Sequence, residues 1–407
     1  MPSWEIGLLY LKKQAAAESE KKMRMIRAFR GCIRKAKALL KKAYRIFLKL
    51  FYVLNQSRLS RISSMNADEA AAILQQYSPK PEGTAIRENR LESPFLYDLQ
   101  IIVPAYNVEK YLRQCLESLL GQKTKYRYHV TIVDDGSVDA TGAIADAYAA
   151  DPRVTVIHQE NRGFSGARNR ALETITGKYL MFVDSDDMLA EHAIETLVDT
   201  AEEKHARIVQ GAFFNLYSES EINIAQKTGS AKRVEPALGN LSGFPWGKVF
   251  DSRLFQNLIF PEGFWFEDSA MSFLCYPRVA EAYVLPQTVY IYRRANPNSI
   301  SNTFSQKPKC IDTFYVTELL MREHYEQNLP ADQTYVEKVF RQIELNETRI
   351  RNVPETVKEA VFVLTTDMVR KYLPREIDSE KYRELIRAIC RKDYGLYRVC
   401  VRLLLLL

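Results

Sequence analysis

The sequence has few residues of the kinds that bind structural metals or cross-link a chain. Its six cysteines and five histidines are scattered through 407 residues, with no CxxC pair and no Cys/His group at metal-ligand spacing. This scarcity argues against a Cys/His metal site. Unpaired, dispersed cysteines also favour a reducing, cytosolic location.

Long hydrophobic runs are missing as well. A membrane-spanning helix needs about 18–20 apolar residues, and the run at 46–54 is too short and is interrupted by Lys49. Basic residues occupy the N-terminal stretch where a signal peptide would carry its apolar core. We therefore expect a protein that does not cross a membrane.

Acidic residues are scarce only at the beginning of the chain. Residues 1–65 contain 16 Lys and Arg against three Glu, whereas the remainder contains 41 basic and 47 acidic residues. The net charge of +7 therefore comes from one segment, and the rest of the chain is mildly acidic. A mildly acidic body argues against nucleic acid as a partner.

Within this basic segment, residues 20–56 are expected to form one amphipathic helix. Its apolar residues recur at alternating steps of three and four: Ile26, Phe29, Ile33, Ala36, Leu40, Ala43, Phe47, Leu50 and Leu54. Such a helix can lie on an anionic membrane surface with its cations at the headgroups. The same spacing also suits a coiled-coil seam or a partner helix, although acidic partners for the cations are absent. Both alternatives remain open.

The remaining chain predicts a linker, an α/β domain and a helical region. Residues 66–97 are polar and are expected to be a linker with one short helix at 67–76. Strand-like apolar runs occur at 99–103, 130–133, 154–157, 179–183, 206–214 and 282–292. Amphipathic stretches occur at 109–121, 140–150, 165–175, 190–203 and 267–276.

Strands that alternate with helices predict a mostly parallel sheet flanked by helices over 98–305, with ligands at the carboxyl ends of the strands. The C-terminal part, 306–407, has helical patterns at 310–327, 332–349, 354–372 and 379–404.

Three carboxylates follow the fourth apolar run. Asp184, Asp186 and Asp187 concentrate negative charge where a strand should end. Mg²⁺ or Mn²⁺ carrying a diphosphate would neutralise them, because these ions prefer oxygen ligands and share their coordination with substrate phosphates. The three carboxylates therefore indicate a site for a metal-bound diphosphate.

Other polar motifs follow the neighbouring runs. Tyr106, after Pro104, offers a flat face for a nucleobase, and Asp135 can accept hydrogen bonds from a base or a ribose. The glycine- and arginine-rich segment 161–169 suits an anionic ligand near the beginning of a helix. Each motif alone is also an ordinary turn or packing feature. Their occurrence at successive strand ends indicates a nucleotide.

The motifs and their order resemble those of the inverting glycosyltransferases of family 2, which have a GT-A fold. The resemblance covers about residues 98–300. It rests on Val-Pro-Ala-Tyr-Asn107, Val-Asp-Asp-Gly-Ser137, Gly-Phe-Ser-Gly-Ala-Arg-Asn169, Phe-Val-Asp-Ser-Asp-Asp187, Trp246-Gly-Lys-Val-Phe250 and Phe-Glu-Asp268.

The resemblance implies a role for each matched residue. Donor binding would involve Pro104, Ala105, Tyr106, Asn107, Asp135, Arg168, Asn169, Asp184 and Ser185. Asp184 and Asp186 would bracket ribose and metal, with Asp186 as the direct metal ligand, and Asp187 would cap the following helix. Asp268 would be the general base that activates the acceptor hydroxyl, with Glu267 as the rival base or as a residue that orients hydroxyls. Trp246 and Trp265 are expected to line the acceptor groove.

The expected function is therefore metal-dependent transfer of one hexose or N-acetylhexosamine from a nucleotide donor, with UDP as the expected nucleotide, and with inversion of configuration. The acceptor would be a glycan or a lipid-linked intermediate of surface polysaccharide at the cytoplasmic face of the membrane. The Gln-x-x-Arg-Trp motif of processive relatives is absent, which favours addition of a single sugar.

Two rival functions fit parts of the same pattern. The first is a non-catalytic nucleotide-sugar or glycan-binding protein recruited through its N-terminal helix, against which the complete carboxylate set argues. The second is a sugar nucleotidyltransferase, which should carry a glycine-rich phosphate loop after the first strand. That position reads Pro-Ala-Tyr-Asn107 here.

Overall fold

The computed structural model describes residues 43, 46, 54, 55, 57–218, 229–236, 239–294, 304–374 and 379–405. The chain divides into two compact units, Ser64–Ile386 and Met1–Ser63 together with Arg387–Leu407. Except for four positions, the predicted basic helix at 20–56 lies outside the described residues, so its role stays a prediction. No described helix is both long enough and apolar enough to span a bilayer.

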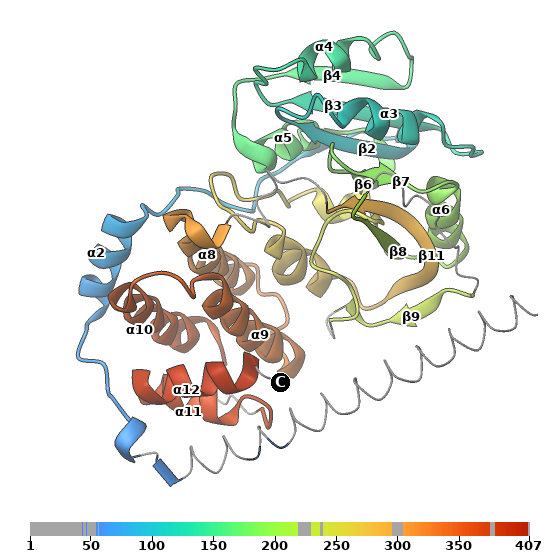
Figure 1. Ribbon diagram of the computed structural model, residues 1–407. Coiled ribbons are helices and arrows are strands. Elements are labelled where there is room, and N and C mark those ends of the chain that lie inside the picture. The colour runs from blue at the N-terminus through green and yellow to red at the C-terminus, as the bar shows by residue number, and fades with distance from the viewer. Residues whose placement is uncertain are drawn as a thin grey trace, which may run out of the picture. The chain divides into compact units, whose positions relative to one another are not determined.

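A nine-stranded sheet forms the centre of the larger unit (Figure 1). Its order is β4 (Val154–His158), β3 (Tyr128–Asp134), β2 (Tyr97–Ala105), β6 (Gly177–Phe182), β10 (Lys248–Asp251), β8 (Ile208–Leu216), β11 (Ala282–Arg293) and β7 (Met188–Leu189), with β9 (Lys232–Val234) paired to β11. The first four strands are parallel, whereas β10 runs antiparallel to both β6 and β8. The carboxyl ends of β2, β3 and β6 therefore meet at one edge of the sheet.

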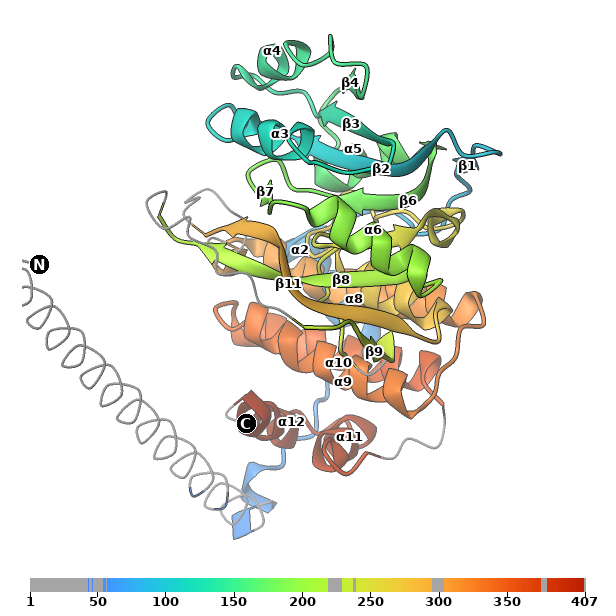
Figure 2. The ribbon, with the colours of Figure 1, turned by 90° about the vertical axis from the view of Figure 1, so that its right-hand side faces the viewer.

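The parallel strands are apolar because helices cover them (Figure 2). In β2, every residue from Leu99 to Ala105 is buried. The covering helices are α3 (Leu112–Leu120), α4 (Thr141–Asp146), α5 (Gly163–Leu172) and α6 (Ala193–Glu203). The predicted α/β class and the strand–helix alternation are confirmed. Strand β10 was not predicted, because four residues are too few to show a period.

Four helices pack together beside the sheet domain within the same unit. They are α2 (Ala67–Tyr77), α8 (Asp312–Glu326), α9 (Gln333–Arg349) and α10 (Glu355–Tyr372), and α2 lies against α10. A reciprocal cap begins α2: the Asn66 side chain accepts from the Glu69 N–H at 2.9 Å and Glu69 accepts from the Asn66 N–H at 3.0 Å. The short helix predicted at 67–76 is confirmed as α2, and the segment predicted as a linker also contains β1 (Arg90–Leu91), which pairs with β5 (Thr174–Ile175).

The last predicted helix, 379–404, is two helices, α11 (Arg383–Cys390) and α12 (Tyr394–Leu405). Lys392 has a φ of 56°, which ends the first helix in the left-handed region. The Asp393 carboxylate then accepts from the Leu396 N–H at 3.0 Å and begins the second helix. The same carboxylate accepts from the Arg61 N–H at 2.9 Å and ties α12 to the segment before α2.

Candidate active site

A cavity of about 870 Å³ lies at the carboxyl edge of the parallel strands. Twelve of the fourteen predicted site residues line it, although they span 165 positions of the chain: Pro104, Ala105, Tyr106, Asn107, Asp135, Arg168, Asp184, Ser185, Asp186, Trp246, Glu267 and Asp268. Because the three parallel strands end together, the motifs that follow them share one site.

The turn after β6 presents two of its three aspartates to the cavity. Asp187 is buried instead, and its carboxylate accepts from the Tyr290 hydroxyl at 2.8 Å and the Arg293 N–H at 2.7 Å. The prediction that Asp187 caps the next helix is therefore wrong, because α6 begins six residues later and β11 supplies its partners. Burial, with the nearby charges of Asp186 and Asp184, raises the pKa of Asp187 well above its ordinary value.

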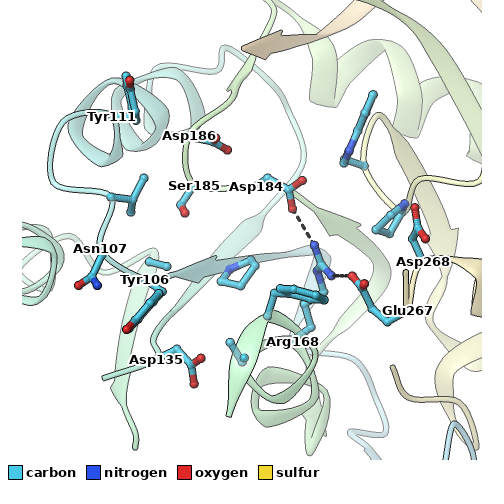
Figure 3. Close-up of a pocket in the computed structure, with 18 of the residues that line it drawn as sticks. Tyr106, Asn107, Tyr111, Asp135, Arg168, Asp184, Ser185, Asp186, Glu267 and Asp268 are labelled. Atoms are coloured by element: carbon cyan, nitrogen blue, oxygen red, sulfur yellow. Dashed lines mark hydrogen bonds and ion pairs between the residues drawn. The ribbon is translucent and has the colours of Figure 1, made fainter. Parts of the chain in front are cut away.

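Arg168 connects this turn to the predicted catalytic pair (Figure 3). Its side chain comes from α5, is 5% exposed, and donates to Asp184 at 2.8 Å and to Glu267 at 2.6 Å. The guanidinium also lies 5.2 Å from the centre of the Phe260 ring. One buried cation thus holds two carboxylates that are 83 residues apart in the sequence.

Glu267 and Asp268 differ in what they can do. Glu267 is buried in its ion pair with Arg168, and burial raises its pKa to about 7, with Asp268 adding to the rise and Arg168 opposing it. Asp268 is half-buried and lines the cavity, and burial raises its pKa while Arg349 and Arg168 oppose the rise. Both carboxylates line the cavity, and Asp268 is the more exposed of the two.

The opposite part of the cavity suits a planar base. Tyr106 is 50% exposed, and Asp135 lies nearby at the end of β3 with 1% exposure. One Asp135 oxygen accepts from the Gln159 amide at 2.6 Å and the Arg162 N–H at 2.9 Å, whereas the other is buried without a partner. An unpaired buried carboxylate oxygen costs free energy unless a ligand donor reaches it.

An aromatic stack forms another wall. Trp246 is 4% exposed and lies between Phe244, at 4.6 Å, and Tyr290, at 4.5 Å. Phe244 is the most exposed of the three rings. The buried Lys248 ammonium holds this loop by donating to the Ser242 hydroxyl and the Phe244 carbonyl, both at 2.7 Å. Burial lowers the pKa of Lys248 to about 7.

Two predicted residues are not among those that line the cavity. Asn169 is buried and uses its amide to bind the backbone of Phe260 in both directions, at 2.8 Å each. Trp265 is half-buried, and its backbone N–H donates to the Asp312 carboxylate at 2.9 Å. Both stabilise the segment that leads to Glu267.

The described residues contain no group of three or more His, Cys, Asp or Glu side chains arranged to hold a metal ion. Mg²⁺ and Mn²⁺ sites that serve a diphosphate usually use one or two carboxylates together with substrate phosphates. Asp184 and Asp186 line the same cavity and raise the pKa of their neighbour Asp187, which shows the concentrated negative charge. The donor set fits a metal completed by substrate.

Sequence reasoning missed several cavity residues. Phe244, Phe266 and Phe304 add aromatic surface, and Arg349 enters from α9 in the C-terminal helices. Phe266 belongs to the Phe-Glu-Asp268 motif and Phe244 lies two residues before Trp246, so their positions in the sequence were an available signal. Arg349 ends an ordinary amphipathic helix and carries no such signal.

Comparison with known proteins shows the family to which the chain belongs. Residues 100–251 match the family model described as "Glycosyl transferase family 2". The chain is 34% identical over 224 residues to glycosyltransferase GlyG of Streptococcus pneumoniae, which covers 51% of this chain and 74% of GlyG. It belongs to glycosyl transferase family 2.

Other relatives in this family are matched over less of their length. The chain is 34% identical to glycosyltransferase GlyA of S. pneumoniae and to the uncharacterized glycosyltransferase EpsJ of Bacillus subtilis. The matches cover 51% and 50% of this chain, but 32% of GlyA and 62% of EpsJ. The chain thus spans about a third of GlyA.

A solved structure of S. aureus TarS, residues 1–349, in complex with UDP-GlcNAc has a TM-score of 0.63 and 23% identity. The match covers 75% of this chain and 90% of that 1–349 chain. That likeness supports the GT-A fold of this family 2 glycosyltransferase.

Proposed function

We propose that this family 2 enzyme is a metal-dependent inverting glycosyltransferase that moves one sugar from a UDP-sugar to a glycan or lipid-linked acceptor in surface polysaccharide synthesis. The observation that carries the proposal is that one cavity contains two carboxylate pairs, Asp184 with Asp186 and Glu267 with Asp268, joined through Arg168. The first pair suits the diphosphate and the second suits the acceptor.

The donor would lie from Tyr106 to Asp186. The ring of Tyr106 would stack on the base, and the unpaired oxygen of Asp135 would accept the imide N–H of uracil. Asp184 and Asp186 would hold Mg²⁺ or Mn²⁺, which neutralises charge on the leaving nucleoside diphosphate when bound. The complex of TarS with UDP-GlcNAc supports a UDP-linked donor.

The acceptor hydroxyl would be activated by Asp268. Its oxygen attacks the anomeric carbon from the face opposite the diphosphate, the bond from that carbon to the phosphate oxygen breaks, and the hydroxyl proton passes to the Asp268 carboxylate. A raised pKa brings this carboxylate nearer to the pH at which it works, which suits a general base. Glu267, bound to Arg168, orients the site rather than taking the proton.

A panel of nucleotide sugars tests the proposal. Purified protein is incubated with UDP- and GDP-sugars, with Mn²⁺ or with EDTA, and released nucleoside diphosphate is measured. We expect metal-dependent release of UDP, slow by hydrolysis alone and faster with glycan or polyprenyl-linked acceptors. Binding of UDP-sugar without any release in metal would instead support the non-catalytic binding protein.

The basic segment 20–56 would place the enzyme at the cytoplasmic face of an anionic membrane. Its excess of Lys and Arg supports this location, where lipid-linked acceptors are exposed. Packing on a partner helix is the competing role of the segment.

A further inference from the structure

Arg349 reaches the cavity from outside the sheet domain. It is the last residue of α9 and lies beyond the segment 100–251 that matches the family model. Its side chain lines the cavity together with Glu267 and Asp268. Arg349 therefore places a guanidinium in the same cavity as the proposed base, Asp268.

The first contact of Arg349 is with the residue that precedes the catalytic pair. Its guanidinium carbon lies 3.8 Å from the centre of the Phe266 ring, the shortest such distance among the cation–ring contacts of the described residues. Phe266 has a φ of 65°, a left-handed conformation that is costly for a bulky side chain. Stacking on Phe266 therefore holds the backbone in the conformation that directs Glu267 and Asp268 to the cavity.

The second contact fixes Arg349 itself. One of its nitrogens donates to the Thr313 hydroxyl on α8 at 3.0 Å. Because that acceptor is neutral, the contact orients the guanidinium without cancelling its charge. Arg168, the other nearby arginine, is instead bound directly to Glu267 and Asp184.

We propose that Arg349 is a positioning residue of the active site, which holds the turn at residues 266–268 through its stack on Phe266 and places a positive charge beside Asp268. This inference rests on the proposed role of Asp268 as the base. It makes the C-terminal helices part of the catalytic unit rather than an appended region.

Several other ionisable groups interact with Asp268, so a pH profile of activity depends on them as well. They are Arg168 from α5, Asp184 after β6, the adjacent Glu267, Lys248 from β10 and Tyr276. Burial raises the pKa of Asp268, and Arg349 is the largest opposing influence. Loss of the Arg349 charge should raise the pKa of Asp268 further. On acidification, the activity of the variant should therefore begin to fall at a higher pH than that of wild type.

The test compares Arg349→Gln and Arg349→Lys with wild type, using Arg341→Gln as the control. Arg341 is an exposed arginine two turns earlier on α9 and does not line the cavity. We expect Arg349→Gln to shift the acid limb of the pH profile of kcat to higher pH by about 1 unit. It should also lower kcat at neutral pH by about 10- to 100-fold, because the turn is displaced. UDP affinity should be unchanged.

Arg349→Lys should leave the acid limb in place, because the charge remains, and should lower kcat, because an ammonium does not stack as a planar guanidinium does. Thermal unfolding of each variant checks that it is folded. If Arg349→Gln does not fold, Phe266→Leu, which removes the stacked ring, should lower kcat without moving the acid limb.

Wild-type kcat and an unmoved acid limb in folded Arg349→Gln would overturn the inference and leave the proposed function intact. A change confined to the KM for the acceptor would also overturn the inference. Where Phe266→Leu is the variant used, a wild-type kcat would overturn it. A wild-type chain that releases no UDP from any donor would overturn both.

Discussion

Replacing Arg168 by methionine tests the buried link between the two carboxylate pairs. The substitution keeps much of the side-chain volume but leaves Asp184 and Glu267 without the cation that binds them at 2.8 and 2.6 Å. Removing one partner of a buried ion pair costs about 3–5 kcal/mol. For a unit of this size, we expect Tm to fall by about 4–8 °C.

The loss should also depend on pH. The pKa of Glu267 is raised from 4.5 to about 7 in the folded protein, although Arg168 lowers it. A carboxyl with a raised pKa contributes its full stability below pH 4.5, and that stability is lost as the pH rises through the folded value. Because Arg168→Met raises this pKa further, the destabilisation should be larger at pH 8 than at pH 5.

Calorimetry of wild type, Arg168→Met and Arg170→Met at both pH values gives the measurement. Arg170 is on the same helix, and its ion pair with Glu173 is exposed, so its loss should cost less than about 1 kcal/mol. Equal Tm values for the two variants, or a larger loss at pH 5, would refute the reasoning.

Three further predictions concern the donor, the acceptor and the N-terminal segment. Asp268→Asn should lower transfer by about 10²–10⁴-fold with UDP affinity unchanged, whereas Ser269→Ala, the neighbouring control, should keep activity; wild-type turnover in Asp268→Asn would reject the base. Asp135→Asn should weaken UDP binding by about 1–3 kcal/mol in calorimetric titration, because the single amide oxygen of Asn cannot accept both from Gln159 and Arg162 and from the base. Equal UDP affinity would remove Asp135 from the base site. The intact chain should sediment with anionic vesicles and a chain lacking residues 1–56 should not; equal partitioning would favour the partner-helix role.

The sheet and the main site could be predicted because they depend on local patterns. Buried parallel strands read as continuous apolar runs, and the residues that follow them must gather at one edge. Asp135 follows one such run, and Asp184 and Asp186 follow another, so their meeting needed only the strand order.

The contacts that could not be predicted join elements far apart in the sequence. Asp187 has the sequence context of a helix cap, but the pairing of β7 with β11 brings it to Tyr290 and Arg293. Lys392 and Asp393 end one helix and begin another inside a continuous amphipathic pattern. Arg349 enters the cavity only through the packing of α9.

Titration of UDP with and without Mn²⁺, in wild type and in Asp186→Ala, tests the central claim most directly. Asp186 lines the cavity at the end of the central strand, where the cation-bound diphosphate is proposed to lie. We expect Mn²⁺ to increase the affinity of the wild type for UDP. In Asp186→Ala, this Mn²⁺-dependent increase in affinity should be smaller by on the order of 10- to 100-fold. The same UDP affinity in both proteins, with and without Mn²⁺, would contradict the account.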